Sequence, residues 1–272
     1  MRNFKISIVC LLVTTLSYAD ICKKQKEALV SIYNSTNGNN WNTKWDLKTP
    51  VKTWHGLTIV NDQVVGIDLS FNNLKGNLPE ELGDLTSLEN IHFGFNKLSG
   101  NLPSSISNLK ELKTLELFMN AFSGEIPDEL GQLKKLKYLK LYANKFTGKI
   151  PKSLMQLTQL KELMLGSNFL MGEIPKGIKK LKALEKFSVM DNQMYGQIPA
   201  ELAQLPHLKE LLLSSNSFTG SSPSELASLK DLKTIMLMGN NLNEIPKALP
   251  AKRTLLNFEP QTATAIMDLE KE

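Results

Sequence analysis

The residues in this chain that could carry acid–base or metal chemistry are few and scattered. The three histidines are His55, His92 and His207, and none belongs to a His-Glu-x-x-His or Cys-His metal-binding pattern. The chain also has no Gly-x-Ser-x-Gly nucleophile elbow and no Gly-rich phosphate-binding loop. We therefore expect no enzyme activity, no catalytic residue, no bound metal and no cofactor.

His92 is the one residue whose neighbours in the repeat pattern suggest acid–base catalysis. Asp68 lies 24 residues before it and Glu116 lies 24 residues after it. If each interval is one repeat, the three side chains lie on adjacent strands, where a carboxylate would raise the pKa of the histidine. An open sheet excludes little water, however, and no nucleophile is nearby. We therefore favour the interpretation that opposite charges on neighbouring strands pair and stabilise the sheet.

A 24-residue repeat sets the elements that position these residues. Apolar residues stand eight, five and three positions before a recurring asparagine, as Leu112, Leu115 and Leu117 stand before Asn120. Glycine follows four residues after the asparagine, and proline seven residues after it, in the first seven repeats. The eight asparagines are Asn72, Asn96, Asn120, Asn144, Asn168, Asn192, Asn216 and Asn240.

Each position of the repeat has a physical role. The Leu-x-Leu pattern predicts a short strand, because successive side chains of a strand point to opposite faces. One repeat cannot bury its own apolar edge, so the strands must stack into a continuous parallel sheet. The asparagine amide can bond to backbone groups that the following turn leaves unpaired. Glycine permits the bend, and proline begins an outer segment with a short helical or 3₁₀ turn.

Residues 139–151, Leu-Lys-Leu-Tyr-Ala-Asn-Lys-Phe-Thr-Gly-Lys-Ile-Pro, resemble the plant-specific class of leucine-rich repeat. That class is known from polygalacturonase-inhibiting proteins and from receptor-kinase ectodomains, and the resemblance extends over about residues 64–250. It implies an α/β solenoid, a right-handed superhelix of about eight repeats with a parallel concave sheet and short helical or 3₁₀ convex turns. It also implies that ligands are held by the concave sheet.

The regions before and after the array predict two caps. We expect a signal peptide at 1–19, an N-terminal cap at 20–63, the repeat array at 64–248 and a C-terminal cap and tail at 249–272. Trp41, Trp45 and Trp54 can cover the open end of the core. Plant relatives carry paired cysteines where this chain has Lys52 and Ile59, which favours a bacterial or protist member.

The first 19 residues have the three regions of a secretory leader: a basic start, a short apolar stretch and small residues before Asp20. Cleavage after Ala19 would remove Cys10 and leave Cys22 alone, so no internal disulfide is expected. No later segment is apolar for long enough to span a membrane. We expect a secreted protein, extracellular or periplasmic. The sequence leaves its oligomeric state and the role of Cys22 open.

Interspersed charges, 32 basic and 27 acidic, give no basis for a nucleic-acid partner. When the repeats are aligned, the outward-facing positions of neighbouring strands form columns along the sheet. These columns place an aromatic cluster among charged residues, which is typical of a recognition surface. The alternative is that these rings pack on one another or on the cap. The predicted binding surface comprises Phe71, His92, Phe95, Glu116, Phe118, Met119, Tyr138, Lys140, Tyr142, Met164 and Met190.

Two non-enzymatic functions remain open at this point. The first is a binding module for a protein, such as a secreted enzyme or receptor, or for a cell-wall polysaccharide. The second is a structural, adhesive or ice-binding protein, which would present an even ladder of Thr or Asn. The column three residues after each asparagine is too irregular to favour the second function: Lys75, Ser99, Ser123, Thr147, Met171, Tyr195, Thr219 and Asn243.

Overall fold

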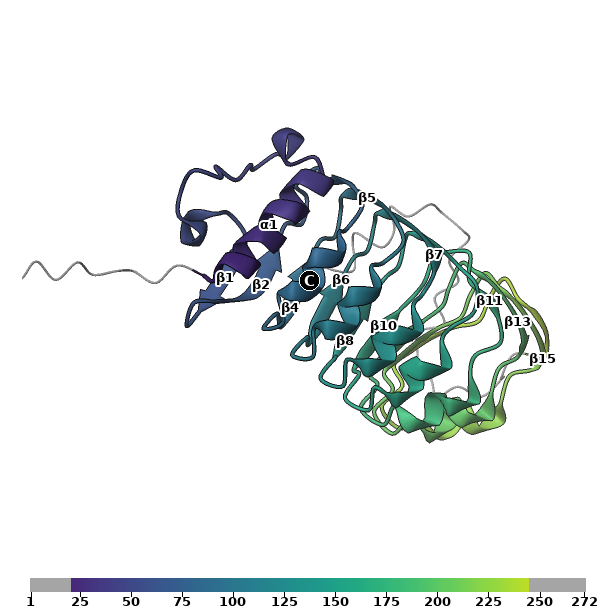
Figure 1. The fold of residues 1–272 in the computed structure, drawn as a ribbon. Helices are drawn as coiled ribbons and strands as arrows, with labels where there is room; N and C mark the ends of the chain where they lie inside the picture. Colours follow the sequence, from purple (N-terminus) through teal and green to yellow (C-terminus); the bar gives the residue numbers. More distant parts are fainter. Residues whose placement is uncertain (1–20, 245–272) are drawn as a thin grey trace, which may run out of the picture.

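The computed structural model describes residues 21–244 and shows a solenoid in which each repeat stacks on the one before (Figure 1). The predicted signal peptide, the end of the array and the predicted C-terminal cap lie outside the described residues. The predicted leucine-rich repeat solenoid, with a parallel sheet and 3₁₀ turns, is confirmed.

One sheet runs along the whole solenoid. Eight strands pair in parallel, in chain order, because each repeat contributes its Leu-x-Leu segment at the same height. An antiparallel ninth strand, β1, closes the N-terminal end. The strands, in sheet order, are β1 (Leu57–Val60), β2 (Gln63–Asp68), β4 (Asn90–His92), β6 (Thr114–Glu116), β8 (Tyr138–Lys140), β10 (Glu162–Met164), β12 (Lys186–Ser188), β14 (Glu210–Leu212) and β16 (Thr234–Met236).

Two shorter parallel sheets form along another side of the solenoid, from the residues that follow the asparagine of each repeat. The sequence patterns had not indicated these strands, which pair residues one to five positions after the asparagine. The first sheet is β3 (Lys75–Gly76), β5 (Lys97–Gly100), β7 (Ala121–Glu125) and β9 (Lys145–Thr147). The second is β11 (Met171–Gly172), β13 (Gln193–Gln197), β15 (Ser217–Ser221) and β17 (Asn241–Glu244).

Short 3₁₀ helices form the side opposite the long sheet. In the repeats, each begins directly after the proline, whose extended backbone leads into the turn. Leucine or isoleucine at the third helical position is buried against the core. The 3₁₀ helices of the repeats are η3 (Glu80–Asp84), η4 (Ser104–Asn108), η5 (Asp128–Gln132), η6 (Lys152–Gln156), η7 (Lys176–Lys180), η8 (Ala200–Gln204) and η9 (Ser224–Ser228).

The N-terminal cap covers the first repeat with a helix and an aromatic cluster. Helix α1 (Lys23–Ser35) lies across the N-terminal end of the solenoid (Figure 1). It is followed by two short 3₁₀ turns, η1 (Gly38–Asn40) and η2 (Val51–Thr53). The rings of Trp41, Trp45 and Trp54 are buried and contact one another in series, with centroids 4.9 Å apart at both contacts. They shield the apolar edge that the first repeat would otherwise expose to water.

The asparagines join successive repeats by side-chain hydrogen bonds. The amide nitrogen of Asn144 donates to the carbonyl oxygens of Leu117 and Leu141, at 3.0 and 3.1 Å, and its amide oxygen accepts from the backbone N–H of Phe122 at 3.0 Å. Similar bonds recur along the ladder, and the amide of Asn72 bonds instead to the backbone of Thr43 in the cap. These bonds satisfy backbone groups that strand pairing leaves unpaired.

Candidate functional site

The solvent side of the long sheet, called the sheet face below, carries all the predicted binding residues on or just after its strands. It corresponds to the surface that the resemblance predicts to be concave. Its side chains alternate with core residues such as Leu115 and Leu139, which are fully buried on the opposite side. Three features of this face stand out: an aromatic row, a charge ladder and a pocket.

The aromatic row crosses four consecutive repeats. Phe71 stacks on Phe95 with ring centroids 4.1 Å apart, and Phe95 meets Phe118 edge to face at 5.3 Å. Phe118 in turn stacks on Tyr142 at 4.7 Å. The contacts are continuous because each ring comes from the equivalent part of successive repeats. The row therefore acts as one packed unit.

The two ends of this row differ in exposure, which corrects the expectation that the whole cluster faces solvent. Phe118 and Tyr142 are only 8% and 7% exposed, whereas Phe71 is 61% exposed. The ring of Phe118 lies over Gly94, where a Cβ atom would be only 2.7 Å from it. The alternative that the rings pack on one another is thus correct for Phe118 and Tyr142. Phe71, with half-buried Phe95 beside it, is the part that a partner can reach.

Phe71, Phe95 and Met119 adopt a backbone conformation that the sequence pattern did not reveal. Their φ angles are +57°, +55° and +52°, in the left-handed region that large side chains rarely occupy. Later repeats have the same turn with Ala143 or Ser167, so the turn itself does not require a large residue. Two aromatic rings at these positions are therefore an addition to the scaffold, and strained residues of this kind cluster at functional sites.

The charge ladder consists of His92, Glu116, Lys140, Glu162, Lys186 and Glu210, one from each of six successive strands of the sheet face. Its N-terminal half joins His92 to Glu116 at 2.8 Å and Glu116 to Lys140 at 3.3 Å. In the aligned repeats these residues form two columns: His92, Glu116 and Lys140 stand four residues before the asparagine, and Glu162, Lys186 and Glu210 stand six residues before it. Lys140 joins them, because its ammonium also lies 3.6 Å from Glu162 in the other column.

Lys186 continues the ladder, 3.9 Å from Glu162 and 3.3 Å from Glu210. The favoured interpretation of these charges, pairing across strands, therefore describes the geometry of the ladder. His92 is one of its members rather than a free acid or base.

The pair of His92 and Glu116 shifts the titration of both groups. The hydrogen bond that His92 donates to the Glu116 carboxylate raises the pKa of His92, and the negative charges of Glu116 and Asp68 add to this effect. Burial and the positive charge of Lys140 oppose it. Burial acts to raise the pKa of Glu116, but the hydrogen bond with His92 and the charge of Lys140 lower it overall. Both shifts favour the charged pair.

Beyond Tyr142 the sheet face changes from aromatic to aliphatic and thioether side chains. Met164 and Met190 are half-buried there, and the side chain of Met190 covers Gly166 as Phe118 covers Gly94. Met238, further along, is exposed. Flexible methionines form adaptable contact surfaces. The predicted residues Met119 and Tyr138 are also half-buried on this face, so the structure brings all the predicted residues to one surface but not to one point.

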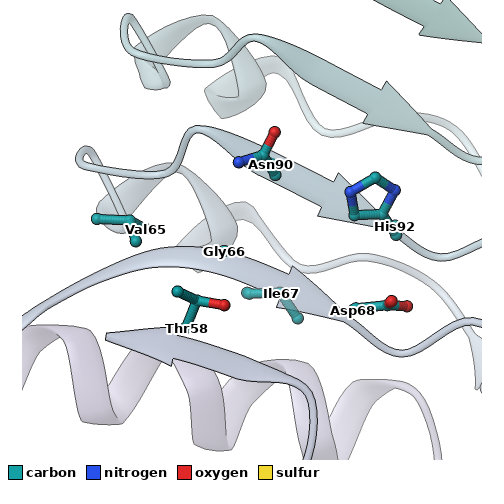
Figure 2. Close-up of a pocket in the computed structure, with 7 residues that line it drawn as sticks. All are labelled: Thr58, Val65, Gly66, Ile67, Asp68, Asn90 and His92. Carbon is teal, nitrogen blue, oxygen red and sulfur yellow. The ribbon is translucent and has the colours of Figure 1, made fainter. Parts of the chain in front are cut away.

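A pocket of about 260 Å³ lies at the N-terminal end of the sheet face. Thr58 of β1, Asp68 of β2 and His92 of β4 contribute side chains from three neighbouring strands (Figure 2). Gly66 pairs with Thr58 on one side and Asn90 on the other, so the missing side chain leaves a gap between those two. Sequence reasoning placed His92 on this surface but missed the pocket, although a glycine in an outward column was the available signal.

The part of the chain that the structure describes contains no group of three or more His, Cys, Asp or Glu that could hold a metal ion. Within residues 21–244, no helix is both long and apolar enough to cross a bilayer. Cys22 is a free, exposed thiol at the start of α1.

Family models match most of the array. A leucine-rich repeat region model matches residues 117–222, and a Leucine Rich Repeat model matches residues 63–85 and 87–109. The chain belongs to the leucine-rich repeat proteins. Its repeats are of the plant type, and Polygalacturonase inhibitor 2 of Arabidopsis thaliana is 33% identical to it over 88 residues. That match covers 30% of this chain and 27% of the inhibitor.

Solved structures share the fold. PEPR1 in its complex with AtPEP1 superposes with a TM-score of 0.74 at 31% identity, over 81% of this chain and 32% of that one. The plant peptide hormone receptor RGFR1, in complex with RGF2, has a TM-score of 0.62 at 36% identity, over 62% and 27%. A plant ice-binding protein has a TM-score of 0.66 at 27% identity, over 82% and 88%. The chain thus spans about a third or less of the PEPR1 and RGFR1 chains.

Proposed function

We propose that this protein is a secreted, non-catalytic binding module that recognises a partner protein through the sheet face. The observation that carries the proposal is the exposed stack of Phe71 on Phe95. Large rings occupy a left-handed position there, where the repeats from Ala143 onward have alanine, serine, aspartate or glycine. Aromatic side chains that keep exposed apolar area beside charged groups are typical of residues that dominate binding energy.

The surroundings of the stack favour a protein over a smooth or repetitive target. The charge ladder lies on the same face, and its alternating signs can select a partner by electrostatic complementarity. The named relatives support the same class of partner: one is an inhibitor of polygalacturonase, and another is a receptor in complex with RGF2. An extracellular location is supported by the leader-like residues 1–19 and by the likeness to such receptors.

Comparative capture tests this proposal. The parent protein is immobilised beside a variant carrying Phe71→Ser and Phe95→Ser, which places in these turns the residue that Ser167 and Ser215 already provide in later repeats. The matched control is Phe169→Ser, which removes a ring that is 47% exposed but lies away from the sheet face, next to β11. All three are exposed to extracellular extracts, to cell-wall fractions and to purified polygalacturonase.

We expect the parent and the Phe169→Ser control to retain a partner protein and the double variant to lose it. If the parent retains a cell-wall glycan and the double variant loses it, Phe71 and Phe95 form the binding site but the partner is a glycan and not a protein. Equal retention by all three proteins would show that the sheet face is not the binding surface.

The likeness to a plant ice-binding protein keeps a structural or ice-binding role as the second candidate. The shorter sheets are the regular surface on which such a role would depend, but they separate into two sets between β9 and β11. Phe169 and Met171 are exposed beside this separation and interrupt any ladder of hydroxyl groups. A thermal-hysteresis measurement on the parent protein decides the matter, because an ice-binding protein depresses freezing and a partner-binding module does not.

A further inference from the structure

Asp68 occupies the first position of the column that continues through His92 and Glu116, yet it forms no ion pair among the described residues. Glu116 and Glu162, in contrast, each lie between two cations of neighbouring strands. On its open side Asp68 lies beside the segment that contains β1: its backbone N–H donates to the carbonyl of Gly56 at 2.7 Å, and Thr58 lines the same pocket, but neither residue is a cation. Within residues 21–244, the one hydrogen bond to its carboxylate comes from the backbone N–H of Ser70, at 3.1 Å.

The pocket lies directly beside this carboxylate. Its volume of about 260 Å³ is small for a whole ligand and suits a single side chain or one ring. Its polar groups are the carboxylate of Asp68, the imidazole of His92, the amide of Asn90 and the hydroxyl of Thr58, and they surround the gap above Gly66 (Figure 2). The pocket therefore combines an unpaired anion with the uncharged hydroxyl of Thr58 and amide of Asn90, beside an imidazole that is paired with Glu116.

The charges around the pocket leave it with a negative balance. His92 is bound through Nδ1 to Glu116, so when the imidazole is protonated the two charges of that pair compensate each other. Lys140 and Glu162, further along the ladder, form a second compensating pair. Asp68 is then the one acidic group near the pocket whose charge no neighbour within 4 Å balances in the described part of the chain. A positively charged group is the occupant that this arrangement favours.

We propose that this pocket receives a lysine or arginine side chain of the partner protein, with its cationic group on Asp68. The proposal rests on the function proposed above and specifies its chemistry: the partner presents a basic side chain beside apolar residues that contact Phe71. The ammonium or guanidinium group extends the alternation of charges by one position. Thr58 and Asn90 can accept its remaining hydrogen bonds.

A titration without the natural partner tests the pocket. Nα-acetyl-lysine methylamide is added to the isotope-labelled full protein, and the backbone amide signals of Gly66, Asn90 and His92 are followed by NMR. The comparison probe is the same molecule with its side-chain amine acetylated, which has the same reach but no charge. We expect weak saturable binding of the charged probe only, and a fall in its affinity as salt is added.

Two variants of equal charge change make the test specific. Asp68→Asn should raise the dissociation constant of the charged probe by about fivefold, the upper range for an exposed ion pair. Asp191→Asn removes another exposed carboxylate after a strand of the same sheet and should leave binding unchanged. Binding that survives Asp68→Asn, or that is equal for the acetylated probe, would overturn the proposal.

A methyl glycoside forms the third arm of the titration. Stronger shifts at Gly66 and Asn90 with this neutral sugar than with the charged probe would identify a carbohydrate subsite and also overturn the proposal. Absence of binding by any probe would do the same. None of these results affects the capture experiment, which depends on Phe71 and Phe95, so failure of the pocket is distinguishable from failure of the proposed function.

Discussion

The ring of Phe118 stacks on the ring of Tyr142 with their centroids 4.7 Å apart and their planes 10° from parallel. Both rings are nearly buried, yet neither belongs to the main core, since they lie on the other side of the sheet from residues such as Leu117 and Leu141. They form a second apolar layer that ties adjacent repeats together. Phe71, at the far end of the same row, is mostly exposed.

This contrast predicts different effects of truncation along the row. Phe118→Ala should lower the free energy of unfolding by about 1–3 kcal/mol, because it removes a buried ring and its stacking contact. Phe71→Ala should change it by less than about 1 kcal/mol, because most of that ring already faces water. Urea denaturation of both variants measures the difference. An equal loss for the two would contradict the division of the row into a structural and a binding end.

Gly94 controls the position of Phe118 through the space above its backbone. A Cβ at residue 94 would lie 2.7 Å from the tip of the Phe118 ring, so Gly94→Ala must displace that ring. We expect a loss of about 1–2 kcal/mol and changed NMR signals for the Phe95 and Tyr142 rings, which contact Phe118. Gly177→Ala, on η7, is the comparison variant: its Cβ would lie 3.0 Å from the Met155 side chain, on the side of the solenoid opposite the sheet face, so the signals of the rings should not change. Unchanged ring signals in Gly94→Ala would refute this packing.

The asparagine ladder predicts a specific cost for its central member. Asn144→Ala leaves the N–H of Phe122 and the carbonyl of Leu117 without their side-chain partner, both in the buried interior. The expected loss of stability is about 1–3 kcal/mol. Asn108→Ala, at an exposed position of η4, should stay within about 0.5 kcal/mol of the parent. A similar loss for both asparagines in thermal unfolding would show that the ladder contributes nothing particular.

The pair of His92 and Glu116 makes stability depend on pH in a defined direction. The pKa of His92 is raised in the folded protein, so its contribution is complete below the usual histidine value near 6.5 and is lost as pH rises through the folded value. The pKa of Glu116 is lowered, so its contribution is present above about 4.3 and is lost at lower pH. The pair therefore stabilises the fold most in the mildly acidic range between these values.

The measurement is the melting temperature of the parent and of His92→Gln in mildly acidic and in alkaline buffer. The parent should lose more stability than His92→Gln on going to alkaline pH, because only the parent loses the charge of His92. The groups that face His92 are Asp68, Glu116 and Lys140, and they are the same in both proteins. Parallel pH profiles would mean that the pair contributes no pH dependence.

The sequence by itself determined the repeat and therefore the fold. A 24-residue period with apolar residues at strand spacing leaves each repeat unable to bury its edge, so stacking into a parallel sheet is the physical solution. The role of the prolines, which begin the outer segments, follows from local chemistry in the same way. The aromatic residues of the first four repeats were also found from their columns alone.

Only the tertiary structure decided which of these side chains a partner can reach. The repeat period and the alignment of the repeats predict on which face of the sheet a residue lies, but not the direction in which its side chain points. The sequence therefore does not reveal that Phe118 packs over Gly94 and is buried. The left-handed turn at Phe71 and the bridge that Lys140 makes between two columns likewise depend on backbone angles and on the reach of long side chains. The pocket beside Asp68 depends on three strands, because Thr58 of β1 and Asn90 of β4 form its walls on either side of Gly66 of β2.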